Sequence, residues 1–309
     1  LEPCCTHGRT PPCTDAVIAA GISKVVVGTT DPNPAHAGKA FGLLRRAGIE
    51  VIELAKDSEF RELAEECSAL NEAFNHWIVH RTTFVTVKAA MTLDGKIATA
   101  RGESKWITGE KARAYTMKLR QSSDAILVGV NTVLADDPTL MPRIKNAPLH
   151  VENAKRRIVL DPQARTPLNA KVVADEFAEL TIIVVSQNAP KDRIAALAKK
   201  VSVLIAPNQK AKIETQKSQI NLRWLLKKLG SENVTSLLVE GGGETNAAFL
   251  LGGFAHRVAF FYAPKVLGGR DARKSVGGDG ITGLSEAIKV CDAYWQWLGE
   301  DLLLTGRIG

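Results

Sequence analysis

The chain has 309 residues, of which 45% are hydrophobic and 24% are charged. This composition is typical of a globular protein, and the length favours two domains. The longest apolar runs, such as residues 180–185 and 258–261, are much shorter than the roughly 20 residues that cross a bilayer, which argues against a helical membrane protein. Five cysteines, two of them adjacent, do not resemble a disulfide framework and favour a reducing cytoplasm.

Charge is distributed unevenly along the chain. Residues 1–80 contain 7 Lys and Arg against 11 Asp and Glu, whereas the rest contains 33 against 22, a net charge of +11. A basic second domain suits either nucleic acid or a phosphorylated small molecule. Because aromatic residues make up only 6% of the chain, and no basic block is interleaved with them, we favour the small molecule and expect no nucleic-acid partner.

Strands and helices are expected to alternate in the first 80 residues. A short buried strand at 24–28 ends in a turn rich in proline, and a helix at 39–47 leads to a second strand at 49–54. Such a strand–helix–strand pattern predicts parallel pairing. A charged amphipathic helix at 57–75 follows, and the pattern restarts near residue 84, so we place the domain boundary near residue 80.

The second domain also alternates, which predicts an α/β fold with a mostly parallel sheet. Strands are expected at 84–90, 96–98, 125–130, 156–160, 180–186, 201–205, 235–240, 257–262 and 301–305. Helices are expected at 109–122, beginning near Thr108 as a plausible cap, and at 190–199, 215–229 and 244–251.

Cys4 and Cys13 lie at the two ends of the loop in LEPCCTHGRTPPC, and each follows a proline. This spacing allows both sulfurs to reach one zinc ion, which binds thiolates in tetrahedral geometry. The alternative is a pair of buried free cysteines. The flanking prolines and the lack of a surrounding apolar stretch favour metal ligands.

Three segments of the second domain carry candidate chemistry. KAAMTLDGKIATARGESKW (88–106) contains a tight Asp-Gly turn, which by itself is a common hairpin connection. LRQSSDAILVGVNTVLADDPTLMPR (119–143) places Asn131 and Thr132 at the carboxyl end of a buried strand, where open α/β sheets bind ligands. Arg120 and Arg143 either grip a phosphate or face solvent. LLVEGGGETNAAFLL (237–251) places three glycines before a helix, which suits a diphosphate or a simple packing turn.

The amino-terminal segment LEPCCTHGRTPPC resembles the zinc segment of the bifunctional riboflavin-biosynthesis deaminase/reductase family, RibD, which reads close to LEPCSHxGRTPPC. The resemblance implies that Cys4 and Cys13 bind zinc, while Cys5 and Thr6 depart from the family's Ser-His pair. The family's zinc-ligand His and catalytic Glu have no counterpart in this sequence. We therefore expect an amino-terminally truncated member with an incomplete zinc site, whose deaminase activity is lost although the full-length parent would deaminate the preceding pyrimidine.

The other three segments, in the same order, resemble the reductase half of that family. The resemblance implies a dihydrofolate-reductase-like domain that uses NADPH to reduce the ribosyl group of 5-amino-6-(5-phosphoribosylamino)uracil to a ribityl chain. It further implies cofactor contacts at Ala90, Trp106, Thr132, Asp136, Gly242, Gly243, Glu244, Thr245, Asn246, Ala247 and Ala248. Substrate contacts are implied at Ser104, Arg120, Leu140, Arg143 and Glu240, whereas the proton donor stays unassigned.

The expected organisation is therefore a carboxyl-terminal remnant of a cytidine-deaminase-like α/β/α domain at 1–80, followed by a reductase domain at 81–309. The cysteine content favours the cytoplasm, and the resemblance also implies a homodimer that acts on a phosphorylated pyrimidine. Two alternatives stay open. One is a monofunctional dihydrofolate-reductase-like pyrimidine reductase, and the other is a zinc-stabilised nucleic-acid-binding module, which the pI of 9.1 would suit.

Overall fold

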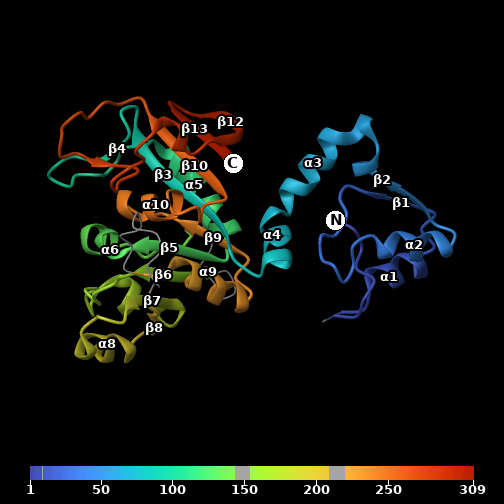
Figure 1. Ribbon diagram of the computed structural model, residues 1–309, viewed down its shortest axis with the longest axis horizontal. Helices are drawn as coiled ribbons and strands as arrows, with labels where there is room; N and C mark the ends of the chain where they lie inside the picture. Colours follow the sequence, from blue (N-terminus) through green and yellow to red (C-terminus); the bar gives the residue numbers. More distant parts are fainter. Residues whose placement is uncertain (9, 143–153, 209–219) are drawn as a thin grey trace. The chain divides into compact units, whose positions relative to one another are not determined.

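The computed structural model describes residues 1–8, 10–142, 154–208 and 220–309. These residues form two compact units, Leu1–Phe84 and Val85–Gly309 (Figure 1). The division between the two units, after Phe84, lies a few residues beyond the boundary predicted near residue 80. In the described residues, no helix is both long enough and apolar enough to cross a membrane.

The first unit contains a two-stranded parallel sheet, as the strand–helix–strand pattern predicts. Its core includes Phe41 and Leu44, which are buried on one side of the amphipathic helix α2. The buried Glu2 carboxylate accepts hydrogen bonds from the backbone amides of Asp31, Gly38 and Ala40, at 3.1, 2.8 and 3.0 Å. The elements are α1 (Cys13–Ala19), β1 (Lys24–Val27), α2 (Lys39–Arg46), β2 (Glu50–Glu53), η1 (Leu54–Lys56), η2 (Ser58–Phe60), α3 (Arg61–Leu70) and α4 (Glu72–His80).

The single helix expected at 57–75 is wrong, because this stretch begins with a 3₁₀ turn and divides into α3 and α4. The Asp57 carboxylate accepts a hydrogen bond from the Glu59 amide at 3.0 Å, which starts the turn at η2. Asn71 separates the two helices in a non-helical conformation, and its side-chain amide donates to the Cys67 carbonyl. Short polar side chains that bind nearby backbone therefore interrupt an otherwise helical pattern.

The second unit is built on a nine-stranded sheet with the order β12-β13-β10-β3-β9-β5-β6-β7-β8. The pairings of β10 with β3, of β9 with β5, and from β5 through β8 are parallel, whereas β13 pairs antiparallel with both β10 and β12. This confirms the predicted α/β fold with a mostly parallel sheet. The strands are β3 (Phe84–Thr92), β4 (Lys96–Ala98), β5 (Ala125–Gly129), β6 (Arg156–Leu160), β7 (Thr181–Ser186), β8 (Ser202–Ala206), β9 (Ser236–Val239), β10 (Arg257–Ala263), β11 (Arg273–Lys274), β12 (Val290–Leu298) and β13 (Asp301–Ile308).

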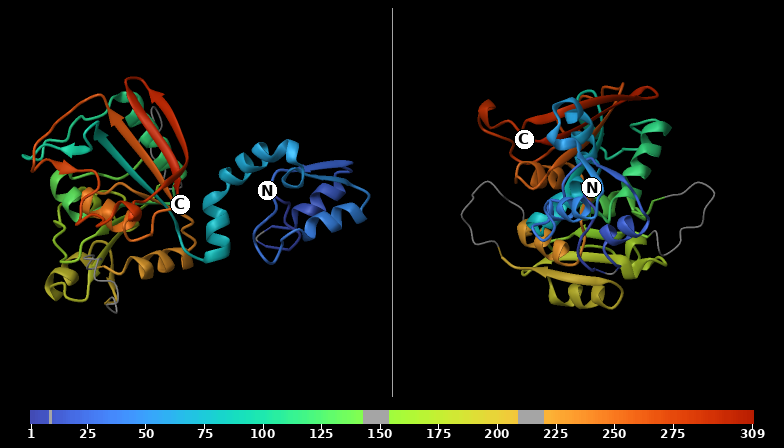
Figure 2. Two further views of the ribbon diagram at one scale, coloured as in Figure 1. Left: turned by 45° about the horizontal axis from the view of Figure 1, so that its top comes forward. Right: turned by 90° about the vertical axis from the view of Figure 1, so that its right-hand side faces the viewer.

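Helices cover both faces of this sheet (Figure 2). One face packs against α9 and α10, and the other packs against α6, α7 and α8, with α5 over β10 and β13. The alternation of side chains along β5 divides Leu127 from Ile126 and Val128, which enter different cores. The helices are α5 (Glu110–Ser122), α6 (Val130–Asp136), α7 (Lys171–Ala174), α8 (Lys191–Ala198), α9 (Leu222–Ser231) and α10 (Gly243–Leu250), with 3₁₀ turns η4 (Ala178–Leu180) and η5 (Leu284–Glu286).

Other differences from the predicted elements concern short or polar segments. Asn131 and Thr132 follow the carboxyl end of β5, as predicted, but they already belong to α6, and α5 begins after Gly109 rather than at a Thr108 cap. The expected start of the helix at 215–229 lies partly outside the described residues, and α9 begins after the capping Asn221. Helices α1, α6 and α7 and strands β11 and β12 were not predicted.

Candidate active site

Strands β5 and β9 are parallel neighbours, and the chain leaves them toward opposite sides of the sheet. From β5 the chain continues through β6, β7 and β8 on one side, whereas from β9 it passes through α10 to β10 on the other side. Helices α6 and α10 therefore begin at the same edge of the sheet, directly after these two strands (Figure 1). Ligands of open α/β sheets bind at such a point.

Two glycines allow α6 and α10 to begin close together. A Cβ added at Gly129 would lie 2.5 Å from the Thr245 hydroxyl oxygen, and one added at Gly241 would lie 2.4 Å from the Thr245 Cβ. Both distances are too short for real carbon atoms. Thr245 therefore occupies the space that the missing side chains leave, which explains a packing role for part of the glycine-rich segment.

The amino terminus of α10 is open at Gly242 and enclosed at Gly243. A Cβ at Gly242 would meet only the Thr132 hydroxyl, at 4.0 Å, whereas one at Gly243 would lie 2.4 Å from the Lys274 carbonyl oxygen. No side chain caps this helix, so its first amides have no competing acceptor from the cap residue. The structure thus brings Thr132 and Gly242 together beside a helix terminus that favours anions.

Two other residues of this helix hold the segment after β11. The fully buried Asn246 amide donates to the Ser275 carbonyl at 2.8 Å, and the Glu244 carboxylate accepts from the Gly278 amide at 3.1 Å. Ala247 is buried and Ala248 is half-buried. Contacts from Asn246 and Ala247 to a ligand would therefore have to come from their backbone.

A charged cluster lies on the sheet face that α5 covers. The Arg120 guanidinium binds the Glu240 carboxylate through Nε at 2.6 Å and Nη2 at 3.1 Å, and its Nη1 donates to the Met141 carbonyl. Lys88 Nζ lies 3.7 Å from Glu240 Oε2 and 5.7 Å from the centre of the Phe261 ring. The Glu240 side chain is only 9% exposed, so these charges lie largely out of water.

The environment changes the pKa of each member of the cluster. Burial lowers the pKa of Lys88 below its ordinary value, and the Glu240 charge only partly opposes this effect. Burial alone would raise the pKa of Glu240, but the charges of Arg120 and Lys88 hold it below its ordinary range. Burial would likewise lower the pKa of Arg120, yet Glu240 raises it. The site therefore holds a carboxylate, a fixed guanidinium and an ammonium that loses its proton more readily than usual.

Lys88 was missed from the sequence, although one signal was present. It is a charged residue in the middle of an apolar strand, FVTVKAAMT, where a lysine is stable only with a partner. Arg120 was predicted as a phosphate ligand. The structure shows that three of its five N–H groups already bind Glu240 and Met141.

Trp106 is exposed and lies in a loop that two cations hold. Lys265 Nζ donates to the carbonyls of Trp106 and Ile107 at 2.9 and 2.7 Å, and the Arg113 guanidinium lies 4.7 Å from the centre of the Trp106 ring. Lys105 Nζ lies 3.6 Å from the Asp136 carboxylate. This contact connects the loop of Trp106 to the end of α6. Two predicted cofactor positions, Trp106 and Asp136, therefore lie in adjoining segments.

The remaining predicted positions differ in accessibility. Ala90 on β3 and Ser104 are half-buried. Leu140 is only 1% exposed, with its side chain in the hydrophobic core, so any contact with a substrate would use its backbone. Arg143 lies outside the described residues.

Cys4 and Cys13 lie together, because the Cys13 amide donates to the Cys4 sulfur at 3.3 Å. Within the described ranges, however, no group of three or more His, Cys, Asp or Glu side chains could hold a metal ion. Two thiols without further ligands do not fit a zinc site, which needs at least three protein ligands. The assignment of Cys4 and Cys13 as zinc ligands therefore rests on the resemblance alone, and the described residues do not complete a zinc site.

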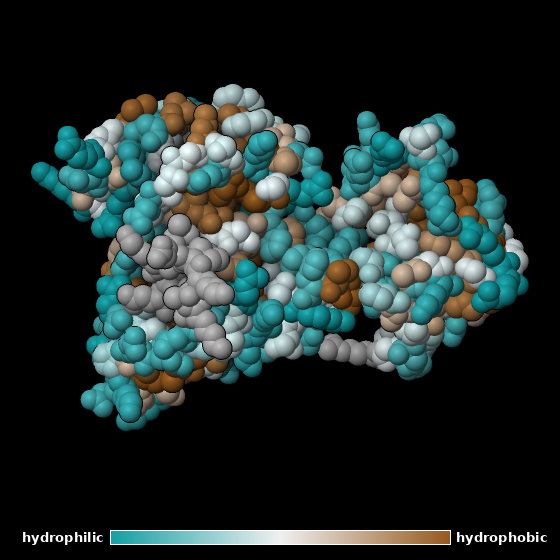
Figure 3. Space-filling view, in the orientation of Figure 1, coloured by the Kyte–Doolittle hydropathy of each residue, from teal (hydrophilic) through white to brown (hydrophobic). Residues whose placement is uncertain are grey.

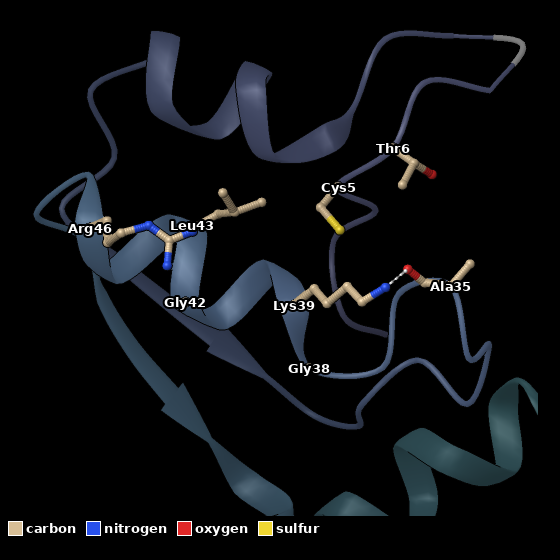
Figure 4. A pocket seen from close by; sticks show the side chains of 8 residues that line it. All are labelled: Cys5, Thr6, Ala35, Gly38, Lys39, Gly42, Leu43 and Arg46. Atoms are coloured by element: carbon tan, nitrogen blue, oxygen red, sulfur yellow. Dashed lines mark hydrogen bonds between the residues drawn. The ribbon is translucent and has the colours of Figure 1, made fainter.

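The first unit also has a shallow open hollow of about 560 Å³ (Figure 4). Cys5 and Thr6 face helix α2 across it, and Lys39 donates to the Ala35 carbonyl at 2.9 Å along its edge. The Cys5 sulfur, which lines this hollow, lies 3.8 Å from Nδ1 of His36. The Lys88–Arg120–Glu240 cluster, in the other unit, is the better candidate for chemistry because its groups are buried and mutually oriented.

Comparisons with known proteins agree on one family. The model of the RibD C-terminal domain matches residues 83–304. Riboflavin biosynthesis protein RibD of Actinobacillus pleuropneumoniae is 44% identical over 98% of this chain and 76% of its own length. The 2,5-diamino-6-ribosylamino-4(3H)-pyrimidinone 5′-phosphate reductase of Methanothermobacter thermautotrophicus is 41% identical over 72% of this chain and 96% of its own length.

A solved structure of RibD from Acinetobacter baumannii is also similar. It has a TM-score of 0.77 and 31% identity, and the match covers all of this chain and 79% of that one. The family model covers most of the second unit, and the structural match extends through both units. The chain therefore belongs to the RibD family, with the family's C-terminal domain at residues 83–304.

Proposed function

We propose that this chain is the NADPH-dependent reductase of riboflavin biosynthesis that converts the ribosyl group of 5-amino-6-(5-phosphoribosylamino)uracil to a ribityl chain. The RibD family and the name of the Methanothermobacter relative support a pyrimidine reductase. Relatives named RibD align with almost the whole chain, which favours the deaminated pyrimidine over the 2,5-diamino compound. The two alternatives named from the sequence, a monofunctional reductase and a nucleic-acid module, are not favoured.

The described residues fit the predicted cofactor. Gly242 leaves open space before the uncapped amino terminus of α10, and Thr132 offers a hydroxyl beside it. A diphosphate is suited to that position, because backbone amides and the helix dipole both favour negative charge. We propose that the residues 242–248, with Ala90, Trp106, Thr132 and Asp136, hold NADPH, which supplies a hydride when bound.

The observation that carries the proposal is the Lys88–Arg120–Glu240 cluster. Reduction of a sugar carbon also requires a proton on the neighbouring oxygen or nitrogen. Lys88 suits this task, since its lowered pKa makes the ammonium a stronger acid than an exposed lysine. Glu240 is held by Arg120 and stays ionised, so it can accept hydrogen bonds from substrate hydroxyl or ring N–H groups. Arg120, and Arg143 beyond the described residues, would add positive charge for the substrate phosphate.

The direct test is NADPH oxidation with the deaminated pyrimidine, the 2,5-diamino compound and dihydrofolate as separate substrates. We expect turnover of the deaminated pyrimidine, with at least a tenfold lower kcat/KM for the others. Preference for either of the other substrates would instead support the monofunctional reductase. Salt-dependent binding to RNA without NADPH binding would support the nucleic-acid module.

We further propose that residues 1–80 belong to the zinc-deaminase type of unit. The proximity of Cys4 and Cys13 and the alignment with RibD proteins through this region support this assignment. Because no group of three or more His, Cys, Asp or Glu side chains among the described residues could hold a metal ion, we expect the 309-residue chain to retain no stoichiometric zinc and to show no deaminase activity. Metal analysis after gel filtration tests this, and retention of one zinc per chain that Cys4→Ser abolishes would contradict it.

A further inference from the structure

The segment that follows α6, residues 137–141, has an unusual backbone. Leu140 adopts a left-handed conformation with φ of 56°, which a bulky side chain rarely does. Its side chain is buried in the core beneath α6, α7 and α8. A strained conformation of this kind persists only where the surrounding contacts determine it. The contacts on both sides of Leu140 are therefore informative.

Two arginines bind the carbonyls on either side of Leu140. Arg120 Nη1 donates to the Met141 carbonyl at 3.2 Å, and Arg157 Nη1 donates to the Thr139 carbonyl at 3.1 Å. Arg120 lies on α5 and belongs to the charged cluster of the candidate site, whereas Arg157 lies on β6 and is not a member of that cluster. The backbone of Leu140 is thus held between two guanidinium groups from different elements.

Arg157 is a rigid support for this backbone. It is completely buried, and it binds both oxygens of the Asp175 carboxylate at 2.6 and 2.8 Å. It also donates to the Thr181 hydroxyl at 2.9 Å and to the Val172 carbonyl at 3.1 Å. Together with the contact to Thr139, these are five hydrogen bonds, as many as a guanidinium has N–H groups. Arg157 therefore holds only protein groups and keeps no donor for a ligand.

The same segment is attached to α7 at a second point. Asp137 also has a left-handed backbone, and its carboxylate accepts a hydrogen bond from the amide of Lys171, the first residue of α7, at 2.8 Å. Asp175, the partner of Arg157, directly follows the last residue of α7. Both ends of this short helix thus fix residues 137–139, one directly and the other through Arg157.

We propose that Arg157 is a positioning residue for the pyrimidine substrate. It fixes Leu140 through Thr139, while Arg120 fixes the other side of Leu140 and binds Glu240. This inference rests on the proposed function, in which Leu140 and Glu240 contact the substrate. Loss of the Arg157 contact moves one of these groups relative to the other, so it weakens substrate binding. The cofactor is held by other residues, and its affinity should not change.

The test is Arg157→Lys, with the deaminated pyrimidine and NADPH as substrates. A lysine can pair with Asp175, but its single ammonium cannot reproduce the fork that also reaches Thr139. We expect KM for the pyrimidine to rise about 10-fold and kcat to change less than about threefold, the pattern of lost uniform binding. The Kd for NADP⁺ should not change. A purely structural role would lower the folded fraction, and with it the apparent kcat, without raising this KM.

Asp175→Asn is the matched control, because it weakens the same buried ion pair but leaves Arg157 on the Thr139 carbonyl. It should lower the urea midpoint of unfolding and leave KM for the pyrimidine unchanged. An equal rise in KM in Asp175→Asn and Arg157→Lys, or a parallel loss of NADP⁺ affinity, would overturn the inference.

Asp137 provides a second test that does not alter a buried charge, since its side chain is 47% exposed. Asp137→Ala should raise KM for the pyrimidine about 3- to 10-fold, whereas Asp137→Asn, which keeps an acceptor for the Lys171 amide, should restore it. If Arg157→Lys does not fold, this pair decides. Unchanged KM in the folded variants of Arg157 and Asp137, with an active wild-type chain, would overturn this inference alone. A wild-type chain that neither binds nor reduces the pyrimidine would overturn the proposed function as well.

Discussion

At the scale of single residues, the site depends on charges that the fold removes from water. Lys88, Arg120 and Glu240 come from a strand, a helix and the end of a second strand, and each stabilises a neighbour that would otherwise be costly to bury. Arg120 and Glu240 were predicted as site residues from their positions in family-like segments, and Lys88 was not. A sequence pattern identifies an unusual lysine in a strand, but not the carboxylate that faces it.

Replacement of Lys88 by arginine distinguishes the role of its positive charge from its role as a proton donor. If Lys88 delivers the proton, kcat/KM should fall as the pH rises through its lowered pKa, below the ordinary lysine value of 10.5. In Lys88→Arg the side chain stays charged across this range, so the alkaline fall should disappear while turnover drops about 100-fold or more. The pH profiles of both proteins test this. An unchanged alkaline fall in the variant would assign the proton to another group.

Arg157 is the most completely buried cation of the described chain, with no exposed side-chain surface. It binds the Asp175 carboxylate at 2.6 and 2.8 Å and donates to the Thr139 carbonyl, close to Leu140. Arg157→Met should lower the free energy of unfolding by about 3 to 5 kcal/mol, because it leaves Asp175 without its partner. Urea denaturation measures this, and Arg156→Ala, which breaks a half-exposed pair, should cost less than about 1 kcal/mol.

At the scale of elements, most buried strands and amphipathic helices of the second unit were predictable, because their apolar patterns are determined by two well-formed cores. The elements that were predicted wrongly or missed are those whose ends or pairing depend on contacts with residues far away in the sequence. The start of α5 is set by a hydrogen bond from the Gly109 amide to Asp301, 192 residues away. Strand β12 has mostly exposed side chains, so burial leaves little alternation to detect in its sequence.

The Asp-Gly turn after β3 also has a long-range role. Asp94 accepts hydrogen bonds from the Thr92 hydroxyl and from the amides of Leu267 and Gly268, at 2.6, 3.1 and 2.7 Å. The Thr92 hydroxyl, followed by these amides, lowers the pKa of Asp94 to about 2. The turn therefore fixes the loop after β10 that carries Lys265, and through it the loop of Trp106.

This arrangement predicts an acid-sensitive loop. Because the folded-state pKa of Asp94 is depressed, its contribution to stability is complete above the ordinary value of 3.8 and is lost as the pH falls through about 2. Hydrogen exchange of the Leu267 and Gly268 amides should accelerate across this window beyond the change in intrinsic exchange rate. Asp94→Asn should abolish that acceleration, and identical protection profiles in the two proteins would contradict the role of the carboxylate.

At the scale of the whole molecule, the antiparallel edge of the large sheet exposes aromatic side chains. Tyr294, Trp295 and Trp297 are all exposed on β12, and Trp295 lies 6.0 Å from Tyr262 between ring centres. On the face in Figure 3, apolar residues gather over the end of the second unit where β3, β10 and β13 are labelled in Figure 1. Exposed apolar patches of this kind are typical of interaction surfaces.

The predicted homodimer is therefore expected to use the β12 face. Trp297→Glu should shift the chain from dimer to monomer at micromolar concentration, because it places a charge in an aromatic contact. Light scattering coupled to gel filtration measures the mass. The control is Tyr115→Phe. Tyr115 is a half-buried residue of α5 whose ring packs on Phe261, and its replacement should not change the measured mass. A dimeric Trp297→Glu variant would place the interface elsewhere.

The contact of Thr245 with Gly129 and Gly241 has an evolutionary consequence. These three residues come from the ends of two strands and from one helix, yet they share a single volume. A Cβ gained at Gly129 would collide with the Thr245 hydroxyl, and one gained at Gly241 would collide with the Thr245 Cβ, so neither fits while threonine occupies position 245. Homologous sequences should therefore show correlated substitution: where alanine replaces Gly129, alanine or glycine, which lack the hydroxyl, should accompany it at position 245.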